Sequence, residues 1–209
     1  NINVGGNLEI VADGGNIHIE GQDIVVGRDA VIMGKEVVIE GAKDESSSSS
    51  SGRGTGVNVG LNILDQTMVA SGNINKDKAN GEGYSYTNTK INVGGNFALI
   101  SEGDTTIKGV NIKTDTVLLD IGKNLNIETL QDYSKTDSKT TGYGFNISSS
   151  AVNTSDKFST GMPTANINAS KSNSEYVWTN NQTSIVAKNG GDINVGDILS
   201  NTGAIIASG

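Results

Sequence analysis

Ile2-Asn3-Val4-Gly5-Gly6-Asn7 is a hexapeptide that returns unchanged as Ile91-Asn92-Val93-Gly94-Gly95-Asn96, at an offset of 91 − 2 = 89 residues. A partial third copy follows at Ile193-Asn194-Val195-Gly196-Asp197. Three further blocks recur at an offset of 88 residues, namely residues 19–24 as 107–112, residues 34–40 as 122–128, and residues 56–59 as 144–147. An offset that holds across four blocks identifies a repeat protein.

Composition and local pattern favour short strands over helices. The 209 residues include 28 Gly and 1 Pro, and only 4% are aromatic. Apolar and polar residues alternate in short runs such as Ile17-His18-Ile19, and glycine-rich turns such as Asp13-Gly14-Gly15-Asn16 separate the runs. The runs follow one another too closely for a β-sandwich. They fit a β-solenoid with about three strands and roughly 20 residues per coil. Asn in stacked turns is expected to form hydrogen-bond ladders along the axis.

Two segments interrupt this pattern. Asp44-Glu45 leads into a serine run at 46–51, and a Ser/Thr-rich segment at 133–142 takes the same place in the second unit. A flexible linker is one interpretation of the serine run. We favour the start of a long antiparallel excursion, because alternating residues follow both segments. Outgoing strands are expected at about 47–64 and 134–152, returning strands at about 83–90 and 167–180, and tips at about 72–80 and 154–163.

These features predict an all-β chain that forms one continuous β-solenoid over residues 1–209. The first repeat unit is expected at about 2–90, the second at about 91–182, and the start of a third at 183–209. The excursions are expected at about 44–90 and 132–182. Since the pattern runs to both ends, we expect a piece of a longer protein. Insertions on one face of a solenoid are the usual place for its binding function.

Charge and cysteine content exclude several functions. The formal net charge of −8 disfavours a broad electrostatic surface for nucleic acid or an anionic membrane. The chain has no Cys, which excludes thiol catalysis and disulfides in this segment. The glycine-rich turns lack the Lys-Ser/Thr and the helix of a phosphate-binding loop.

The order of the motifs resembles the hemagglutinin-repeat segments of filamentous-hemagglutinin-type exoproteins. The resemblance rests on motifs found in both units: Gly-Gly-Asn strands at 5–10 and 94–99, Gly-Lys strands at 34–39 and 122–127, acidic Ser/Thr runs at 44–51 and 132–134, and Gly-apolar strands at 56–60 and 144–147. It covers essentially the whole chain. It implies a right-handed parallel β-helix that is secreted to the surface of a Gram-negative bacterium by two-partner secretion.

The resemblance also implies partners and a role without catalysis. The parent protein would pass through the outer-membrane secretion pore of its two-partner system. The leading hypothesis is a stalk segment that mediates adhesion to a cell-surface glycan, protein or membrane. The alternative is a segment of a contact-dependent growth-inhibition protein that engages the target-cell outer membrane during toxin delivery. A polysaccharide-active β-helix enzyme is a remote third. The cut ends of the solenoid expose strand edges, so end-to-end self-association is also expected.

Few residues suggest chemistry of their own. His18 is the sole histidine, and alternation places it on the outer, solvated face without evident partners for catalysis or metal binding. Gly190-Gly191-Asp192 is the nearest approach to a calcium-binding solenoid turn, but it lacks the third Gly and the repetition. We expect no catalytic residue, no cofactor and no metal site.

The aromatic residues are the best candidates for binding. Tyr84 with Tyr86, and Tyr176 with Trp178, are i, i+2 pairs, so each pair shares one face of a returning strand. The pairs recur at an offset of 176 − 84 = 92, close to the repeat. They are expected either to cover the inner face of the excursion or to form a partner-contact surface.

Overall fold

The structure is a computed structural model that describes residues 1–62, 67–151, 158–160 and 162–209. The described chain consists of strands joined by turns, and it divides into two compact units. Residues 1–45, 84–133 and 177–209 form the solenoid unit, and residues 46–83 and 134–176 form the sheet unit. Within the described residues, no helix is long and apolar enough to cross a membrane.

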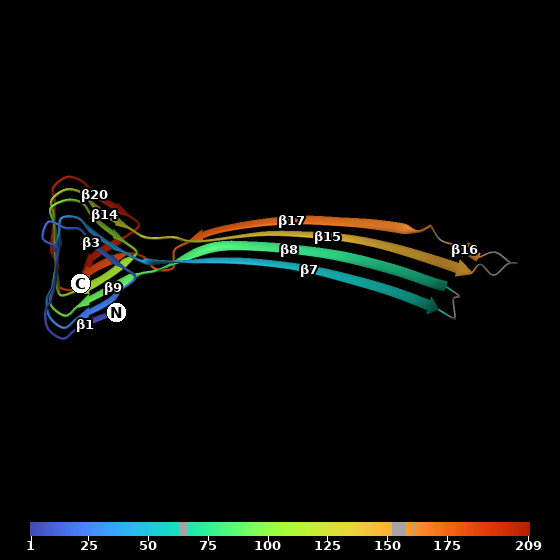
Figure 1. Cartoon of the computed structure of the whole chain (residues 1–209), viewed down its shortest axis with the longest axis horizontal. Coiled ribbons are helices and arrows are strands. Elements are labelled where there is room, and N and C mark those ends of the chain that lie inside the picture. The colour runs from blue at the N-terminus through green and yellow to red at the C-terminus, as the bar shows by residue number, and fades with distance from the viewer. Residues whose placement is uncertain (63–66, 152–157, 161) are drawn as a thin grey trace. The chain divides into compact units, whose positions relative to one another are not determined.

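Three parallel sheets form the walls of the solenoid unit (Figure 1). The first contains β1 (Ile2–Val4), β4 (Asp23–Val26), β9 (Thr89–Val93), β12 (Val110–Thr114), β18 (Ser184–Ala187) and β21 (Ile205–Ser208). The second contains β2 (Leu8–Val11), β5 (Ala30–Gly34), β10 (Asn96–Ser101), β13 (Thr116–Ile121) and β19 (Gly191–Val195). The third contains β3 (Ile17–Glu20), β6 (Val37–Glu40), β11 (Thr105–Lys108), β14 (Leu125–Glu128) and β20 (Leu199–Thr202).

Stacked aliphatic side chains fill the interior of the coils. In the first sheet, Ile24, Ile91, Ile112 and Ile185 occupy one register position in four successive strands. Each of the four is at most 1% exposed. Because every coil buries its inward face on the next coil, the core is continuous along the axis.

The spacing of these isoleucines shows where the excursions are inserted. Ile91 to Ile112 is one coil of 112 − 91 = 21 residues, whereas Ile24 to Ile91 takes 91 − 24 = 67 residues and Ile112 to Ile185 takes 185 − 112 = 73. The longer intervals contain the excursions, which leave after β6 and β14 and return at β9 and β18. Every second coil therefore carries one excursion, and this produces the repeat of nearly 90 residues.

At the corner between the third and first sheets, the coils without an excursion turn on a glycine. Gly21, Gly109 and Gly203 have φ values of 59°, 60° and 70°, a conformation that costs other residues about 1–2 kcal/mol. In the excursion coils, Gly41 and Thr129 follow the third-sheet strand instead, and the chain continues outward. This corner therefore either makes a tight glycine turn or releases a hairpin.

A threonine hydroxyl closes the solenoid where each excursion returns. Thr89 Oγ1 donates to the carbonyl oxygen of Glu40 (2.6 Å), and Thr183 Oγ1 donates to that of Glu128 (2.7 Å). Both threonines are fully buried. Each hydroxyl also accepts a backbone N–H from the adjacent glycine-turn coil, from Gln22 and Gly109 respectively. The exit and return points of each excursion are thus joined by a buried hydrogen-bond pair.

The expected side-chain ladder in the stacked turns is present in mixed form. Asn7 Oδ1 accepts the backbone N–H of Asp29 (3.4 Å), and Asp29 Oδ1 accepts both the backbone N–H (2.8 Å) and the side-chain amide (2.9 Å) of Asn96. Asp104 accepts the same two groups from Asn124. In both pairs one Asp oxygen accepts two donors of an Asn, and the negative charge of the carboxylate strengthens these hydrogen bonds.

The sheet unit is one antiparallel layer. Its strands are β7 (Ala42–Asn62), β8 (Thr67–Thr87), β15 (Asp132–Ala151), β16 (Phe158–Thr160) and β17 (Thr164–Trp178). The four long strands lie in the order β7-β8-β15-β17 and alternate in direction (Figure 1). The hairpin of the first repeat, β7–β8, therefore pairs laterally with the hairpin of the second, β15–β17.

The predicted fold class, an all-β parallel solenoid with long antiparallel hairpins, is confirmed. The expected tip at 72–80 is wrong, because these residues lie inside β8. Their polarity suggested a loop, but a single-layer sheet exposes both faces and needs no buried alternation. Part of the second expected tip, at 154–157 and 161, lies outside the described residues. The bounds of the repeat units stay a prediction.

Candidate functional site

Tyr84 and Tyr86 lie together, as their i, i+2 spacing predicts. Their ring centroids are 5.7 Å apart with an interplanar angle of 75°, an edge-to-face contact. A third ring joins them, because Tyr133 stacks on Tyr84 at 5.3 Å and 22°. Such contacts each stabilise by about 0.5–1.5 kcal/mol beyond burial. Sequence reasoning missed Tyr133. This residue lies at the start of β15, which is next to β8 in the sheet.

Lys43 adds a positive charge to this cluster. Its Nζ lies 4.6 Å from the centroid of the Tyr84 ring and 2.6 Å from Glu45 Oε1. The hydrogen bond from Lys43 lowers the pKa of the Glu45 carboxyl, and the same bond raises the pKa of Lys43. Both groups therefore stay charged near neutral pH, and the ammonium remains over the ring.

The tyrosines border a groove of about 770 Å³ within the solenoid unit. Its lining is mostly polar and comprises Tyr84, Tyr86, Glu128, Thr129, Leu130, Gln131, Thr179, Asn180, Gln182, Thr202 and Gly203. Asp132 supports one wall, since its buried carboxylate accepts the backbone N–H of Tyr86 (2.7 Å) and the side-chain amide of Asn180. Aromatic rings beside amides and hydroxyls can bind an amphipathic polar ligand such as a sugar.

The second predicted pair is placed differently. Tyr176 and Trp178 both lie in β17 and are 64% and 40% exposed. Among the described residues, neither ring takes part in the aromatic contacts of Tyr84, and neither lines the groove. The four residues expected to form one kind of surface thus comprise a clustered, half-buried pair and an exposed pair.

One face of the sheet unit is apolar, which sequence reasoning did not identify. Neighbouring strands are in register such that Val57, Gly72 and Phe145 lie side by side, and a Cβ added to Gly72 would lie 2.5 Å from the Phe145 ring. Directly opposed residues of antiparallel strands share a face. On this face lie Val57, Val59, Leu61, Met68, Ala70, Ile74, Tyr143, Phe145, Ile147, Ala165 and Ile167.

The apolar side chains of this face are open to solvent. Val57 is 76% exposed, Ile167 is 72% exposed and Phe145 is 50% exposed. The Phe145 ring covers Gly72, and a hollow of about 300 Å³ lies beside them, with Val57, Ile74 and Tyr143 in its lining. Monomeric soluble proteins rarely expose contiguous apolar patches larger than a few hundred Å², so such a face marks an interaction surface.

The opposite face carries glycine and asparagine. Gly142 leaves room for the Asn75 side chain, whose Oδ1 would lie 2.9 Å from an added Cβ. Asn73 covers Gly56 and Asn166 covers Gly144 in the same way. The outgoing strands supply the glycines and the returning strands supply the asparagines. This face is therefore polar, and around these glycines it is uncharged.

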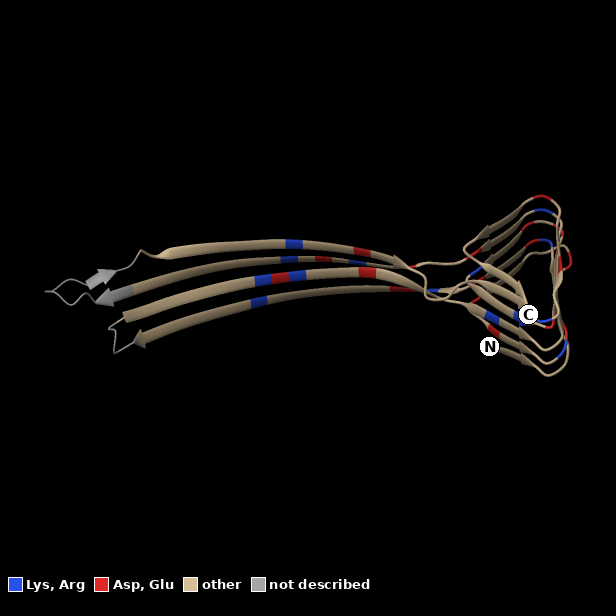
Figure 2. Cartoon of the chain, turned by 180° about the vertical axis from the view of Figure 1, so that it is seen from behind, with Lys and Arg blue, Asp and Glu red and all other residues tan. Residues whose placement is uncertain are grey.

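Among the described residues, one half of the sheet unit carries no charged side chain (Figure 2). Asp65, Asp156 and Lys157 lie outside the described residues. Residues 54–62, 67–75, 140–151 and 164–170 contain no Asp, Glu, Lys or Arg. The charged residues of the long strands gather in the other half, where Lys135 pairs with Glu82 (3.5 Å). The apolar face and the uncharged asparagine face thus belong to the same charge-free half.

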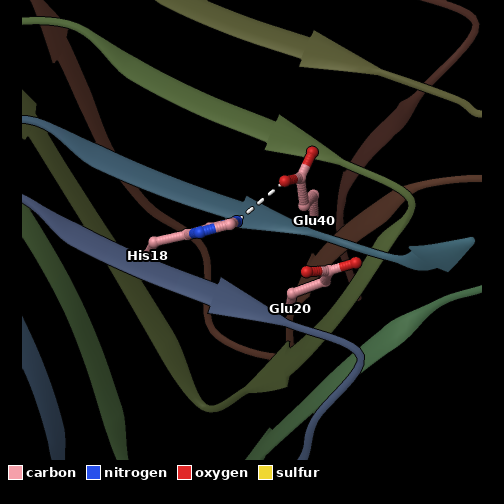
Figure 3. Close-up of side chains that lie close together, drawn as sticks. All are labelled: His18, Glu20 and Glu40. Carbon is pink, nitrogen blue, oxygen red and sulfur yellow. Dashed lines mark hydrogen bonds and ion pairs between the residues drawn. The ribbon is translucent and has the colours of Figure 1, made fainter.

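His18 has acidic neighbours that sequence reasoning did not foresee. Glu20 and Glu40 are opposed in register on β3 and β6, and His18 Nε2 lies 2.7 Å from Glu40 Oε1 (Figure 3). One ligand atom from each of the three lies within 4.8 Å of the others, which is the sole such grouping among the described residues. A histidine nitrogen with two carboxylates suits zinc chemically. The His18 side chain is 56% exposed, in keeping with its expected outer position.

Comparison with known proteins agrees with this architecture. A family model described as the hemagglutinin repeat matches residues 1–144. The chain belongs to the hemagglutinin repeat family. The resemblance drawn from the two motif series is thereby confirmed. No solved structure matches the chain.

Curated relatives of this hemagglutinin-repeat chain are much longer proteins. It is 31% identical over 213 residues to "Toxin CdiA" of Yersinia pestis, with 99% of this chain and 6% of the relative covered. It is 31% identical over 220 residues to "Deoxyribonuclease CdiA" of Yersinia pseudotuberculosis serotype O:3 (strain YPIII), and the match covers 99% of this chain and 20% of the relative. It is 33% identical over 224 residues to "tRNA nuclease CdiA" of Escherichia coli (strain NC101), and the match covers 99% of this chain and 7% of the relative. The chain thus spans a fifth or less of each.

The family indicates in which class of proteins this segment occurs and where those proteins are found. Hemagglutinin-repeat proteins and CdiA proteins are secreted, cell-surface exoproteins of Gram-negative bacteria that belong to two-partner secretion and contact-dependent inhibition systems. The nuclease names describe whole proteins of which this repeat region is a small part. The hemagglutinin repeat is accordingly a segment of a large exoprotein.

Proposed function

We propose that this segment is a non-catalytic stalk module of a contact-dependent inhibition exoprotein, and that its sheet unit engages the outer membrane of the target cell. The observation that carries the proposal is the charge-free half of the sheet, with its exposed apolar face. Of the two leading functions considered from sequence, this favours outer-membrane engagement during toxin delivery over adhesion to a specific receptor. The relatives' names, a toxin and two nucleases, support a delivery role.

The length of the charge-free half suits a bilayer. Residues 54–62 and 67–75 are nine-residue segments of β7 and β8. Nine residues of strand span about 30 Å, and the hydrocarbon core of a bilayer is also about 30 Å thick. Strands that cross outer membranes alternate apolar and polar residues in segments of this length. The half of each strand that carries Lys and Glu would remain in water.

Burial of apolar surface, and not charge, would drive the binding. The chain carries a formal net charge of −8, so an anionic membrane surface repels it at long range. Each fully buried Val, Leu, Ile or Phe side chain contributes about 1.5–3 kcal/mol. Binding is therefore expected to weaken little as salt is raised, in contrast to binding through a basic patch.

Vesicle flotation tests the proposal. Full-length protein is mixed with vesicles of phospholipid and lipopolysaccharide, and the floated fraction is measured for the triple variant Val57→Ser, Phe145→Ser, Ile147→Ser. We expect the floated fraction to fall at least about tenfold, because three apolar anchors are lost. The matched control carries Asn58→Ser and Asn146→Ser on the opposite face and should float like the parent. Equal flotation of both variants would overturn the proposal.

Adhesion to a glycan is the second candidate function, and the groove beside Tyr84 and Tyr86 favours it. A sugar would stack on Tyr86 and bond to the amides of Asn180 and Gln182 in the groove wall. The test is a glycan-array screen of the parent and of Tyr86→Ser, with Tyr176→Ser as the exposed-ring control. A hit that survives Tyr86→Ser unchanged would exclude this groove as the adhesion site.

A further inference from the structure

Three side chains with metal-ligating atoms meet on the outer face of the third sheet (Figure 3). His18 and Glu20 are two residues apart in β3, so both project from the same face of the strand. Glu40, in the neighbouring strand β6, lies directly opposite Glu20 in the parallel register. The pairing of β3 with β6 therefore sets the relative positions of all three side chains.

The three groups are close enough to share one metal ion. One ligand atom from each lies within 4.8 Å of the others, and His18 Nε2 lies 2.7 Å from Glu40 Oε1. Zinc holds imidazole nitrogen and carboxylate oxygen at about 2.0–2.2 Å, so two ligand atoms on one zinc ion are about 3–4 Å apart. His18 and Glu20 are exposed and Glu40 is partly exposed, so small side-chain rotations reach this spacing.

The second repeat has a neutral ion pair where the first repeat has two carboxylates. At the offset of 88 residues, β11 and β14 take the places of β3 and β6, and Glu128 corresponds to Glu40. Lys108 stands where the first repeat has Glu20, and its Nζ lies 2.9 Å from Glu128 Oε2. Like charges at neighbouring positions repel. The Glu20–Glu40 pair of the first repeat would therefore be stabilised by a bound cation.

A second difference between the repeats lies on the same strand face. His18 stands where the second repeat has Thr106. Lys108 is also opposed to Glu40 in register, but its ammonium group pairs with Glu128. The first repeat thus has an imidazole and a carboxylate in place of a hydroxyl and an ammonium group, and both of these groups ligate zinc.

We propose that His18, Glu20 and Glu40 bind one zinc ion, with water completing its tetrahedral coordination. The imidazole selects zinc over calcium and magnesium, which take oxygen ligands. The ion would neutralise the opposed carboxylates and link two successive coils of the solenoid. All three ligands come from two strands that pair within the chain, and the site is independent of the sheet unit and of membrane binding.

Zinc titration of the untagged full chain tests the proposal, and the sole histidine makes the readout specific. Zinc chloride is added while the imidazole signals of His18 are followed by NMR, and calorimetry gives the affinity and the stoichiometry. We expect one equivalent of zinc to shift the His18 signals, whereas magnesium or calcium in excess leaves them in place. If His18 only pairs with Glu40 as a protonated imidazole, its signals will not respond to zinc, and this result would overturn the proposal.

Two single variants separate this site from the general acidity of the chain. Glu20→Gln should weaken zinc binding at least about tenfold, because a neutral amide is a poorer zinc ligand than a carboxylate. The matched control is Glu9→Gln on the exposed face of β2, which removes the same charge away from the site and should bind zinc like the parent. Equal affinity of the parent and Glu20→Gln, or equal weakening by both variants, would contradict the proposed ligands.

The double variant His18→Thr, Glu20→Lys gives the first repeat the residues of the second. It should fold, because the introduced lysine can pair with Glu40 as Lys108 pairs with Glu128. Zinc should raise the thermal unfolding midpoint of the parent but not of this variant, since the ion binds only to the folded site. An equal rise in both proteins would show that zinc binds elsewhere and would overturn the proposal.

Discussion

Glycine with positive φ sets the path of the chain at single residues. Gly21 and Gly109 close the third-to-first-sheet corner in the coils without an excursion, while Gly14 makes a turn elsewhere with nearly the same φ of 64°. A Cβ at Gly21 would lie 2.6 Å from Ala42 Cβ, whereas nothing lies within 4 Å of one at Gly14. Comparing a substitution at each of the two glycines therefore separates the cost of backbone strain from the cost of a steric clash.

Substitution at these glycines gives a paired prediction. Gly14→Ala should destabilise by about 1–2 kcal/mol, the cost of a left-handed alanine. Gly21→Ala should cost about 1–3 kcal/mol more, because the new methyl group meets Ala42 Cβ, which cannot move without the backbone. Urea unfolding followed by circular dichroism measures the difference. Equal midpoints for both variants would show that the corner tolerates a side chain.

The contact between Asp104 and Asn124 affects the ionisation of the Asp104 carboxyl. The side-chain amide and backbone N–H of Asn124 hold the pKa of Asp104 below its ordinary value. The folded state therefore gains stability from this ionised carboxylate above the unfolded pKa of about 3.9, and loses it as pH falls through the lower folded pKa. Asn124→Ala should raise the Asp104 pKa in an NMR titration. The pKa of Glu45 should not move, since Lys43 holds it.

At the scale of elements, the buried threonines Thr89 and Thr183 hold the solenoid closed at the points where the two hairpins leave and return. Thr183 Oγ1 donates to Glu128 O and accepts the N–H groups of Gly109 and Val110. Gly109 N–H also donates directly to the Glu128 carbonyl oxygen (3.1 Å), so the hydroxyl reinforces this backbone contact and adds Val110 N–H to it. A small side chain thus helps to close a coil in which Ile112 and Ile185 are 185 − 112 = 73 residues apart.

Replacing this hydroxyl by a methyl group isolates its effect. Thr183→Val keeps the shape but removes the three hydrogen bonds of the buried hydroxyl, and should destabilise by about 1–3 kcal/mol. Thr106→Val on the partly exposed face of β11 is the control and should change stability by less than about 0.5 kcal/mol. Thermal unfolding of both variants measures the difference. If Thr106→Val lowered the stability as much as Thr183→Val, a specific role for the Thr183 hydroxyl would be contradicted.

Sequence alone predicted the elements whose signals are local. Alternation at Ile17 and Ile19 and the repeated Gly-Gly-Asn turns were sufficient for the solenoid, because inward residues must be apolar in every coil. The polar tract at 72–80 was misassigned, because a strand in a single-layer sheet has no buried face to reveal it. The apolar face and Tyr133 were missed for a different reason. Both depend on which strands pair, and pairing between residues 133 − 84 = 49 or 145 − 72 = 73 positions apart leaves no local mark in the sequence.

At the scale of the whole molecule, the two units carry different properties. The solenoid unit holds the buried core and the repeated hydrogen bonds of the corners. The sheet unit holds the exposed apolar face and the charge-free half. Within the described residues, the core cluster draws all its members from the solenoid unit. The sheet is therefore free to present to a partner the apolar surface that a globular domain would bury.

The most direct test measures which face of the sheet enters a membrane. An environment-sensitive fluorophore is attached to a single cysteine at Val59 on the apolar face, at Asn58 on the polar face, or at Lys35 in the solenoid. Vesicles of phospholipid and lipopolysaccharide are then added, and the emission is recorded. Our account predicts a blue shift at position 59 that lipid-attached quenchers suppress, with little change at positions 58 and 35. No shift at position 59, or the same shift at all three positions, would contradict membrane engagement through the apolar face.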